Sequence, residues 1–246
     1  MTVDGTDRTA AAGGEGASGP APCVLEARGV GKVYHPASSR VVVALDRVSQ
    51  RFEAGGLHVI WGPSGCGKTT LLSLLGGLDM PTTGEVLVDG TPLDRLSEPE
   101  LSLFRRRRVG FLFQNSNLLA GVPLWANVSL SMVPDGISSA SRRAAAGARL
   151  AELGLEDLGD RTPEELSGGE VHRAALARAL VRDPDILLAD EPTSQIDEAN
   201  AAGVMAVLDR LARAGKVVVV ASHDRFVREA ARWVTELKST RRAIGG

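Results

Sequence analysis

The 246-residue chain has few cysteines, few aromatic residues, little net charge and no long apolar run. Its two cysteines, Cys23 and Cys66, are too few for a disulfide framework or a zinc site, and they suit a reducing cytosol. A formal charge of −2 provides no bulk attraction to nucleic acid, so we expect no nucleic-acid partner. No segment is apolar over the roughly 18 residues that a membrane-spanning helix requires.

The composition also separates the ends of the chain from its centre. Residues 1–22 are rich in alanine, glycine, serine and proline and lack the pattern of a secretory signal, so we expect a disordered tail there. Hydrophobic residues make up 43% of the chain, which is enough for a globular core. We place one domain at 23–237 and a frayed end at 238–246.

Short apolar runs alternate with helical patterns along the chain. "LHVIWG" (57–62), "DILLADEP" (185–192) and "KVVVVASHD" (216–224) are typical of strands in a parallel sheet that is covered on both faces. With helices between them, such strands predict an α/β layer fold. The helical patterns cover 68–76, about 169–182 and 198–213.

Four other segments have different patterns. Alternating stretches within 24–55 and 84–94 predict antiparallel strands beside the main sheet. Residues 117–165 are rich in Ala, Leu, Arg and Glu and predict a helical subdomain inserted into the α/β core. The basic run Arg105–Arg108 is either a solvated face or a contribution to contacts at a membrane.

The stretch "GPSGCGKT" (62–69) fits the pattern G-x-x-x-x-G-K-[ST] between a predicted strand and a predicted helix. Its glycines allow backbone N–H groups to surround an anion, and the helix adds its N-terminal dipole. Lys68 would bring a positive charge to the β- and γ-phosphates, and Thr69 would offer a hydroxyl to Mg²⁺. We therefore expect a nucleoside triphosphate to contact Gly62, Pro63, Ser64, Gly65, Cys66, Gly67, Lys68, Thr69 and Thr70, with Cys66 as a small filler.

An acidic pair, Asp190-Glu191, ends the apolar strand "ILLADE". Ligands of open α/β sheets bind at this carboxyl edge. Alone, the pair would be interpreted as a cap for the next turn. Beside the glycine loop, Asp190 is predicted to hold Mg²⁺ and Glu191 to accept a proton from an attacking water.

A second glycine-containing stretch, "LSGGE" (166–170), precedes another predicted helix. Ser167 and Glu170 fit a capping box, which by itself explains a helix start. Gly168 and Gly169 lower helix stability in the first turn, so they suggest that something approaches the backbone closely. An exposed helix N-terminus of this kind is a second phosphate site.

With both glycine stretches present, the chain resembles the ATP-binding-cassette (ABC) family over about residues 23–237, and "LSGGE" corresponds to its signature motif. The resemblance implies a P-loop NTPase core with a parallel sheet, an antiparallel β subdomain and an α-helical subdomain at about 117–165. It implies ATP and Mg²⁺ as ligands and hydrolysis of ATP to ADP and phosphate. It also implies a second cassette, as homodimer or heterodimer, with each ATP between one copy's glycine loop and the other's Ser167, Gly168, Gly169 and Glu170.

The same resemblance implies roles for four more residues. Tyr34 corresponds to the aromatic residue that stacks on adenine. Gln114 corresponds to the glutamine that contacts Mg²⁺ and the attacking water. Asp197 resembles the D-loop aspartate, and His223 resembles the histidine that contacts the γ-phosphate.

The implied partner is a separate membrane permease that docks on the helical subdomain, with the chain peripheral on the cytoplasmic face of the membrane. The segments 76–86, 107–119 and 126–130 resemble most the cassettes of the lipoprotein-release, macrolide-export and cell-division types. Two alternatives stay open: a regulatory cassette with slow turnover that signals to a cell-envelope or division partner, and a soluble ABC ATPase. Departures from the family pattern occur at Trp61, Ala126, Val171-His172 and Gln195-Ile196.

Overall fold

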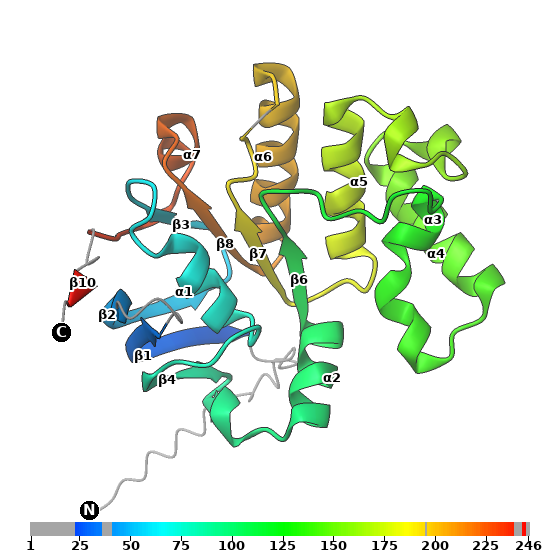
Figure 1. Cartoon of the computed structure of the whole chain (residues 1–246). Helices are drawn as coiled ribbons and strands as arrows, with labels where there is room; N and C mark the ends of the chain where they lie inside the picture. The colour runs from blue at the N-terminus through cyan, green and yellow to red at the C-terminus, as the bar shows by residue number, and fades with distance from the viewer. Residues whose placement is uncertain (1–22, 36–40, 195, 239–242, 245–246) are drawn as a thin grey trace, which may run out of the picture.

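The computed structural model describes residues 23–35, 41–194, 196–238 and 243–244, which form two five-stranded sheets flanked by helices (Figure 1). The parallel sheet has the strand order β6-β7-β8-β3-β9, and the antiparallel sheet has the order β10-β2-β1-β4-β5. The predicted architecture is thereby confirmed. The strands are β1 (Val24–Tyr34), β2 (Val41–Glu53), β3 (Leu57–Trp61), β4 (Thr83–Val88), β5 (Thr91–Pro92), β6 (Val109–Leu112), β7 (Ile186–Asp190), β8 (Val217–Ser222), β9 (Trp233–Glu236) and β10 (Ala243–Ile244).

Helices cover both faces of the parallel sheet and build a lobe at one side of it (Figure 1). The helices predicted at 68–76, 169–182 and 198–213 are confirmed, each to within about two residues. Short 3₁₀ turns lie at Leu93–Arg95, Leu130–Asp135, Glu156–Leu158 and Pro163–Glu165. The α-helices are α1 (Lys68–Leu75), α2 (Glu98–Arg108), α3 (Leu124–Val128), α4 (Ser139–Glu152), α5 (Gly168–Leu180), α6 (Glu198–Arg213) and α7 (Arg225–Glu229).

Some predicted segments lie outside the residues that the structure describes. The predicted tail at 1–22 and residue Gln195 are not among the described residues. Of the predicted frayed end, only residues 238 and 243–244 are described, and β10 pairs with the start of β2.

Helix α1 lies between the two sheets and positions the glycine loop at its N-terminus. Leu71, Leu72 and Leu75 of this helix are fully buried, in one cluster with residues of both sheets such as Phe52 and Val219. On β8, alternate residues belong to different clusters: Val219 packs on the α1 side, whereas Val218 and Val220 pack with Leu208 of α6. This double burial explains why β8 is apolar without interruption.

Helix α5 joins the core to the helical lobe. Its Ala175 and Leu176 pack with β7 and β8, whereas its Ala174 and Ala177 pack with Leu150 of α4. The predicted helical subdomain at 117–165 therefore has its own small core, which is completed by one face of α5. The lobe cannot move against the sheets without moving the helix that begins at Gly168.

The arginine run ends α2, a helix that the sequence analysis did not predict. Arg106 forms an ion pair with Asp135 of the lobe at 2.6 Å, and Arg105 donates to the Gly77 carbonyl at 2.9 Å. Arg108 pairs with Asp89 at 2.8 Å, and only Arg107 is exposed. The solvated-face interpretation is therefore wrong for three of the four arginines, which tie α2 to its neighbours.

Within the described ranges, no helix has both the length and the apolar character that crossing a membrane requires.

The burial of α1 leads to a stability prediction. Leu72→Ala is expected to lower the free energy of unfolding by about 2–5 kcal/mol, because it leaves a cavity between two sheets. Leu78→Ala is the matched control, since Leu78 is 49% exposed and its loss should change stability by no more than about 0.5 kcal/mol. Urea denaturation measures both. Equal effects would contradict the placement of α1.

Candidate functional site

The glycine loop turns between β3 and α1 as predicted. Gly67 has φ +105° and forms the N-cap of α1, and a Cβ there would lie 2.5 Å from the Ala44 carbonyl oxygen. Only glycine satisfies both conditions. No side chain caps α1, so the N–H groups of its first turn face the loop without an intrahelical partner. These groups and the helix dipole favour an anion at this position.

Lys68 supplies the positive charge of the site from an enclosed position. Its side chain is 6% exposed, and its Nζ donates to the Gly62 carbonyl at 2.9 Å and the Pro63 carbonyl at 3.3 Å. Nζ also lies 3.2 Å from Glu191 Oε1. In this state the ammonium group is neutralised by residues of the chain itself, as a buried charge must be.

Glu191 lies at the end of β7 in a left-handed backbone conformation, with φ +47°. This uncommon conformation of a non-glycine residue is held by a hydrogen bond from its N–H to the Ala221 carbonyl at 2.8 Å. Its carboxylate accepts from Ser222 Oγ at 3.1 Å, and His223 Nδ1 lies 2.8 Å from Oε1. An ionised carboxylate can only accept, so Nδ1 carries the proton. With Lys68 Nζ, these two side chains make three contacts that fix the orientation of the Glu191 carboxylate.

Asp190 precedes it and carries a buried oxygen without a partner. Among the described residues no donor reaches its Oδ1, whereas the Thr69 hydroxyl hydrogen-bonds the carboxylate. Burial raises the pKa of Asp190, and the neighbouring Glu191 carboxylate raises it further, against the opposing Thr69 hydroxyl and Lys68 ammonium. A buried carboxylate oxygen without a donor is suited to a cation.

These residues fit a magnesium ion that is completed by a ligand. No group of three His, Cys, Asp or Glu residues in the described part of the chain makes a metal site on its own. Mg²⁺ commonly takes one or two carboxylates and fills its other positions with water and phosphate oxygens. Asp190, Thr69 and Gln114 provide a carboxylate, a hydroxyl and an amide oxygen, and Thr69 and Gln114 line the same pocket.

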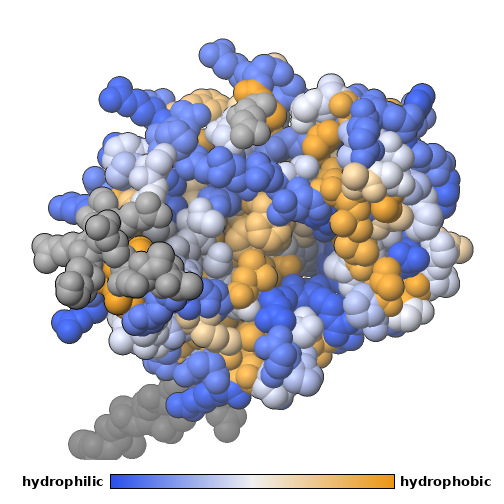
Figure 2. All heavy atoms as spheres, in the orientation of Figure 1, coloured by the Kyte–Doolittle hydropathy of each residue, from blue (hydrophilic) through white to orange (hydrophobic). Residues whose placement is uncertain are grey.

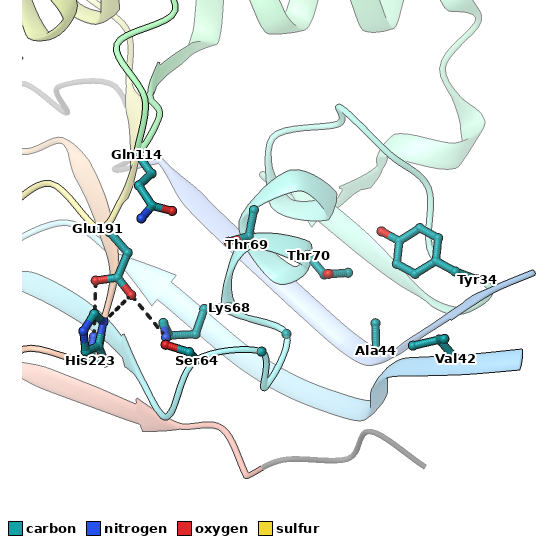
Figure 3. Close-up of a pocket in the computed structure, with 12 residues that line it drawn as sticks. Tyr34, Val42, Ala44, Ser64, Lys68, Thr69, Thr70, Gln114, Glu191 and His223 are labelled. Atoms are coloured by element: carbon teal, nitrogen blue, oxygen red, sulfur yellow. Dashed lines mark hydrogen bonds and ion pairs between the residues drawn. The ribbon is translucent and has the colours of Figure 1, made fainter. Parts of the chain in front are cut away.

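Figure 3 shows how the pocket is arranged from one end to the other. Glu191 and His223 lie at one end, Lys68 and Ser64 follow, and Tyr34 lies at the far end beyond Thr70. Tyr34 comes from β1 and is 38% exposed. The pocket thus has a charged end and an aromatic end. Its lining consists of Tyr34, Val42, Ala44, Ser64, Gly65, Gly67, Lys68, Thr69, Thr70, Gln114, Glu191 and His223.

Several residues of the pocket and its surroundings were not predicted from the sequence. Val42 and Ala44 line the aromatic end, and Ser222 orients Glu191. A serine beside the predicted His223 was a visible signal for the last of these. Cys66 is buried in the core below the loop, which agrees with its expected role as a filler.

The signature residues and Asp197 do not line this pocket. Ser167 caps α5, and Glu170 Oε2 accepts from the Ser167 N–H at 2.8 Å, which confirms the capping box. Asp197 caps α6 in the same way, through the Asn200 N–H at 2.9 Å. The single chain therefore leaves these residues apart from the pocket, which most of the other predicted ligands line. Gly62, Pro63, Cys66 and Asp190 are not among its lining residues.

Asn200 links the two caps. Its side-chain amide donates to Asp197 Oδ2 at 2.6 Å and accepts from Arg173 of α5 at 2.6 Å. A Cβ on Gly169 would lie 2.7 Å from the Asn200 amide, so a larger residue there would displace this side chain. The Asn200 side chain thus approaches the backbone at Gly169 closely, whereas a Cβ on Gly168 would meet nothing within 4 Å.

The sequence departures have structural consequences. His172 is buried and directed toward the Pro192 carbonyl, and burial lowers its pKa. It therefore does not extend from the surface as a longer polar residue would. Trp61 packs against the core beside α7, with Arg228 4.5 Å from its ring centroid.

Comparison with known proteins settles the family. The profile of the family described as ABC transporter matches residues 45–194, which include the glycine loop, the signature stretch and the acidic pair. The chain belongs to the ABC transporter family. The cassette is 40% identical over 202 residues to the lipoprotein-releasing system ATP-binding protein LolD of Chromohalobacter salexigens, which covers 82% of this chain and 85% of that protein.

Longer relatives match only in part. The cassette is 40% identical over 214 residues to the macrolide export ATP-binding/permease protein MacB of Rhodopseudomonas palustris, which covers 87% of this chain. It spans about a third of the length of that relative. Among solved structures, the dimeric cassette MJ0796 is 34% identical with a TM-score of 0.81, covering 90% of this chain and 99% of that one. A second MJ0796 structure, bound to ADP and Pi, is 33% identical with a TM-score of 0.80 and has the same coverage.

The buried charge of Asp190 predicts that its removal stabilises the magnesium-free cassette but weakens ligand binding. Asp190→Asn is expected to raise the free energy of unfolding of the magnesium-free cassette by about 1 kcal/mol at neutral pH, because it removes a desolvated carboxylate. The same change should weaken binding of a magnesium–nucleotide complex by more than about tenfold. Thermal denaturation in EDTA and calorimetric titration measure the two effects.

The pH dependence provides the control. The pKa of Asp190 is higher in the folded chain than its ordinary 3.8, so its destabilising charge is lost as the pH falls through the raised value. The stability difference between the variant and the wild type should therefore shrink at acidic pH. A difference that is constant with pH would argue against a buried charge at Asp190.

Proposed function

We propose that this cassette binds ATP with Mg²⁺, hydrolyses it to ADP and phosphate, and thereby drives rearrangement of a separate membrane permease. The main support is the single pocket that holds the glycine loop, the enclosed Lys68 and the Glu191–His223 pair. The names of the relatives add to it. LolD belongs to a lipoprotein-releasing system, MacB to macrolide export, and one MJ0796 structure holds ADP and Pi.

The contacts of Lys68 suggest how ATP would change the site. Phosphate oxygens are charged acceptors and would replace Glu191 and the loop carbonyls as partners of Nζ. Glu191 would then be free to accept a proton from a water molecule, while Ser222 and His223 keep its carboxylate in place. Mg²⁺, held by Thr69, Gln114 and Asp190, would neutralise charge that develops on the phosphates.

The proposal includes a second cassette. The residues at the starts of α5 and α6 lie outside the pocket: Ser167, Gly168 and Asp197 are exposed, and Gly169 and Glu170 are half-buried. In a head-to-tail pair they would close over the nucleotide of the other copy, as the resemblance to the family implies. The dimeric MJ0796 cassette supports this arrangement.

The proposed permease docks on the helical lobe, with the cassette peripheral on the cytoplasmic face of a membrane. A groove between the core and the lobe supports this position, and Figure 2 shows apolar side chains gathered around a hollow on this face. Leu78 and Leu130 contribute exposed apolar surface to the groove. Its walls also carry four arginines, which are Arg105, Arg106, Arg178 and Arg182.

The role of Glu191 is tested by removing its charge. Glu191→Gln should keep ATP binding, lower turnover by a factor of about 10² or more, and trap an ATP-bound dimer, because the amide cannot accept the proton. Steady-state hydrolysis and size-exclusion chromatography measure these outcomes. Glu156→Gln is the charge-matched control at an exposed position of the lobe and should behave as wild type. An unchanged rate in Glu191→Gln would refute Glu191 as the base.

The shared site is tested by mixing two inactive variants. Lys68→Ala disables the glycine loop of the copy that carries it. Ser167→Arg disables the signature stretch that this copy would present to the nucleotide of the other copy. If sites are shared in a homodimer, a mixed pair combines the intact glycine loop of one variant with the intact signature stretch of the other and so has one working site of two. About half of the pairs in an equal mixture are mixed, so the mixture should recover roughly a quarter of wild-type hydrolysis. Absence of recovery, with both variants folded and mixed pairs confirmed by crosslinking, would contradict shared sites.

A further inference from the structure

A hydrogen-bonded network connects Tyr34, at the aromatic end of the pocket, to Asp79 and Lys32, and neither of the last two residues has a role in the function proposed above. The Tyr34 hydroxyl donates to Asp79 Oδ2 at 3.0 Å. Lys32 Nζ donates to the other carboxylate oxygen, Oδ1, at 2.6 Å and to the Met80 carbonyl at 2.7 Å. The Met80 N–H also donates to Asp79 Oδ1, at 2.7 Å. Both oxygens of Asp79 are therefore engaged, and one of them holds the tyrosine.

The network joins two separate parts of the fold. Lys32 and Tyr34 belong to β1, whereas Asp79 follows the C-terminal end of α1, with its N–H 3.3 Å from the Ser73 carbonyl oxygen. Helix α1 begins at Lys68, and its first three residues line the pocket, whereas Asp79 lies in the chain that follows its C-terminal end. Asp79 thus fixes Tyr34 relative to the same helix that presents the glycine loop.

Lys32 also covers part of the tyrosine. Its Nζ lies 5.0 Å from the centroid of the Tyr34 ring and is largely enclosed, with the side chain 12% exposed. An ammonium group over an aromatic ring is attracted by the electrons of the ring face. One face of Tyr34 is therefore occupied by the chain itself, and the part of the ring that lines the pocket remains accessible.

Asp79 is ionised at neutral pH. Burial by itself raises the pKa of its carboxyl, but the hydrogen bonds from Lys32, the Met80 N–H and Tyr34 outweigh burial and leave the pKa below its ordinary value. The Tyr34 hydroxyl consequently donates to a charged acceptor, which strengthens a hydrogen bond relative to a neutral pair. The ring is held more firmly than a tyrosine whose hydroxyl contacts only water.

We propose that Asp79 is a positioning residue for nucleobase recognition: anchored by Lys32, it holds the Tyr34 ring in the orientation that stacks on the base. This inference rests on the proposed function: with the phosphates of ATP at Lys68, the base would lie toward Tyr34 at the other end of the pocket. A ring that is already oriented loses less side-chain freedom when the base binds, and the affinity for the base increases accordingly. The triphosphate, at the other end of the pocket, gains nothing from the network.

Simple electrostatics predicts the opposite change in ATP affinity when the Asp79 carboxylate is removed. ATP is strongly anionic, so removal of the negative charge of Asp79 would by itself strengthen binding of both ATP and a bare polyphosphate. The positioning role predicts weaker binding of ATP alone. The direction of the change therefore separates the two explanations.

The experiment compares ATP with inorganic tripolyphosphate, each with Mg²⁺, by calorimetric titration of the full chain. Asp79→Ala should weaken ATP binding by about two- to tenfold and leave tripolyphosphate binding unchanged. Tyr34→Phe keeps the ring but loses the hydroxyl, so it should show a similar loss. Tyr34→Phe also removes the hydrogen bond between the hydroxyl and Thr70. Because Asp79 acts on the ring through the hydroxyl, the double variant should be no weaker than Tyr34→Phe.

Asp94→Ala is the matched control, because it removes the same charge from an exposed residue near the same sheet and should bind both ligands as wild type does. Equal losses for ATP and tripolyphosphate, tighter ATP binding or an additive double variant would each overturn the positioning role. Wild type that binds no ATP would overturn the proposed function itself. Wild type that binds ATP while Asp79→Ala and Tyr34→Phe remain unchanged would overturn only the inference.

Discussion

The site depends on one constraint, which is that the ammonium group of Lys68 is enclosed and must always have acceptors. In the state described here these acceptors are two loop carbonyls and the Glu191 carboxylate. A ligand that brings its own negative oxygens can displace them, whereas a neutral ligand cannot. The selectivity of the pocket for anions therefore follows from burial of a charge, in addition to the curvature of the glycine loop.

The position of Lys68 depends in turn on helix α1. The helix is short, from Lys68 to Leu75, and would be unstable alone. Leucines on more than one side of it are buried, because both sheets contribute to the cluster around it. The antiparallel sheet, which carries Tyr34, and the parallel sheet, which carries Glu191, thus share one packed helix. The packing of α1 between the sheets therefore sets the distance between Tyr34 and Glu191 at the two ends of the pocket.

Much of this arrangement could be predicted from sequence where local pattern and tertiary role coincide. Strands such as β7 and β8 are apolar throughout because both faces are covered, and the glycine loop needs particular backbone angles. β6 escaped prediction because it has only four residues and follows four arginines. β9 escaped because it is a short edge strand with alternating exposure.

The side-chain network around Tyr34 was not predictable for a different reason. Lys32 and Asp79 are 47 positions apart, and no local pattern marks two residues as partners across that separation. The arginine run was misjudged on similar grounds, since the acceptors of Arg106 and Arg108 lie in other elements. Motifs report what the backbone must do locally, whereas ion pairs between elements appear only once the fold is known.

The contact between Gly169 and Asn200 has a mechanical consequence. It ties the start of α5 to the start of α6 through a single amide, with Arg173 on its other side. Two helix starts that share such a brace would shift as one rigid block. A force applied to the signature stretch at the start of α5 would therefore reach Asp197 at the start of α6 through Arg173 and Asn200.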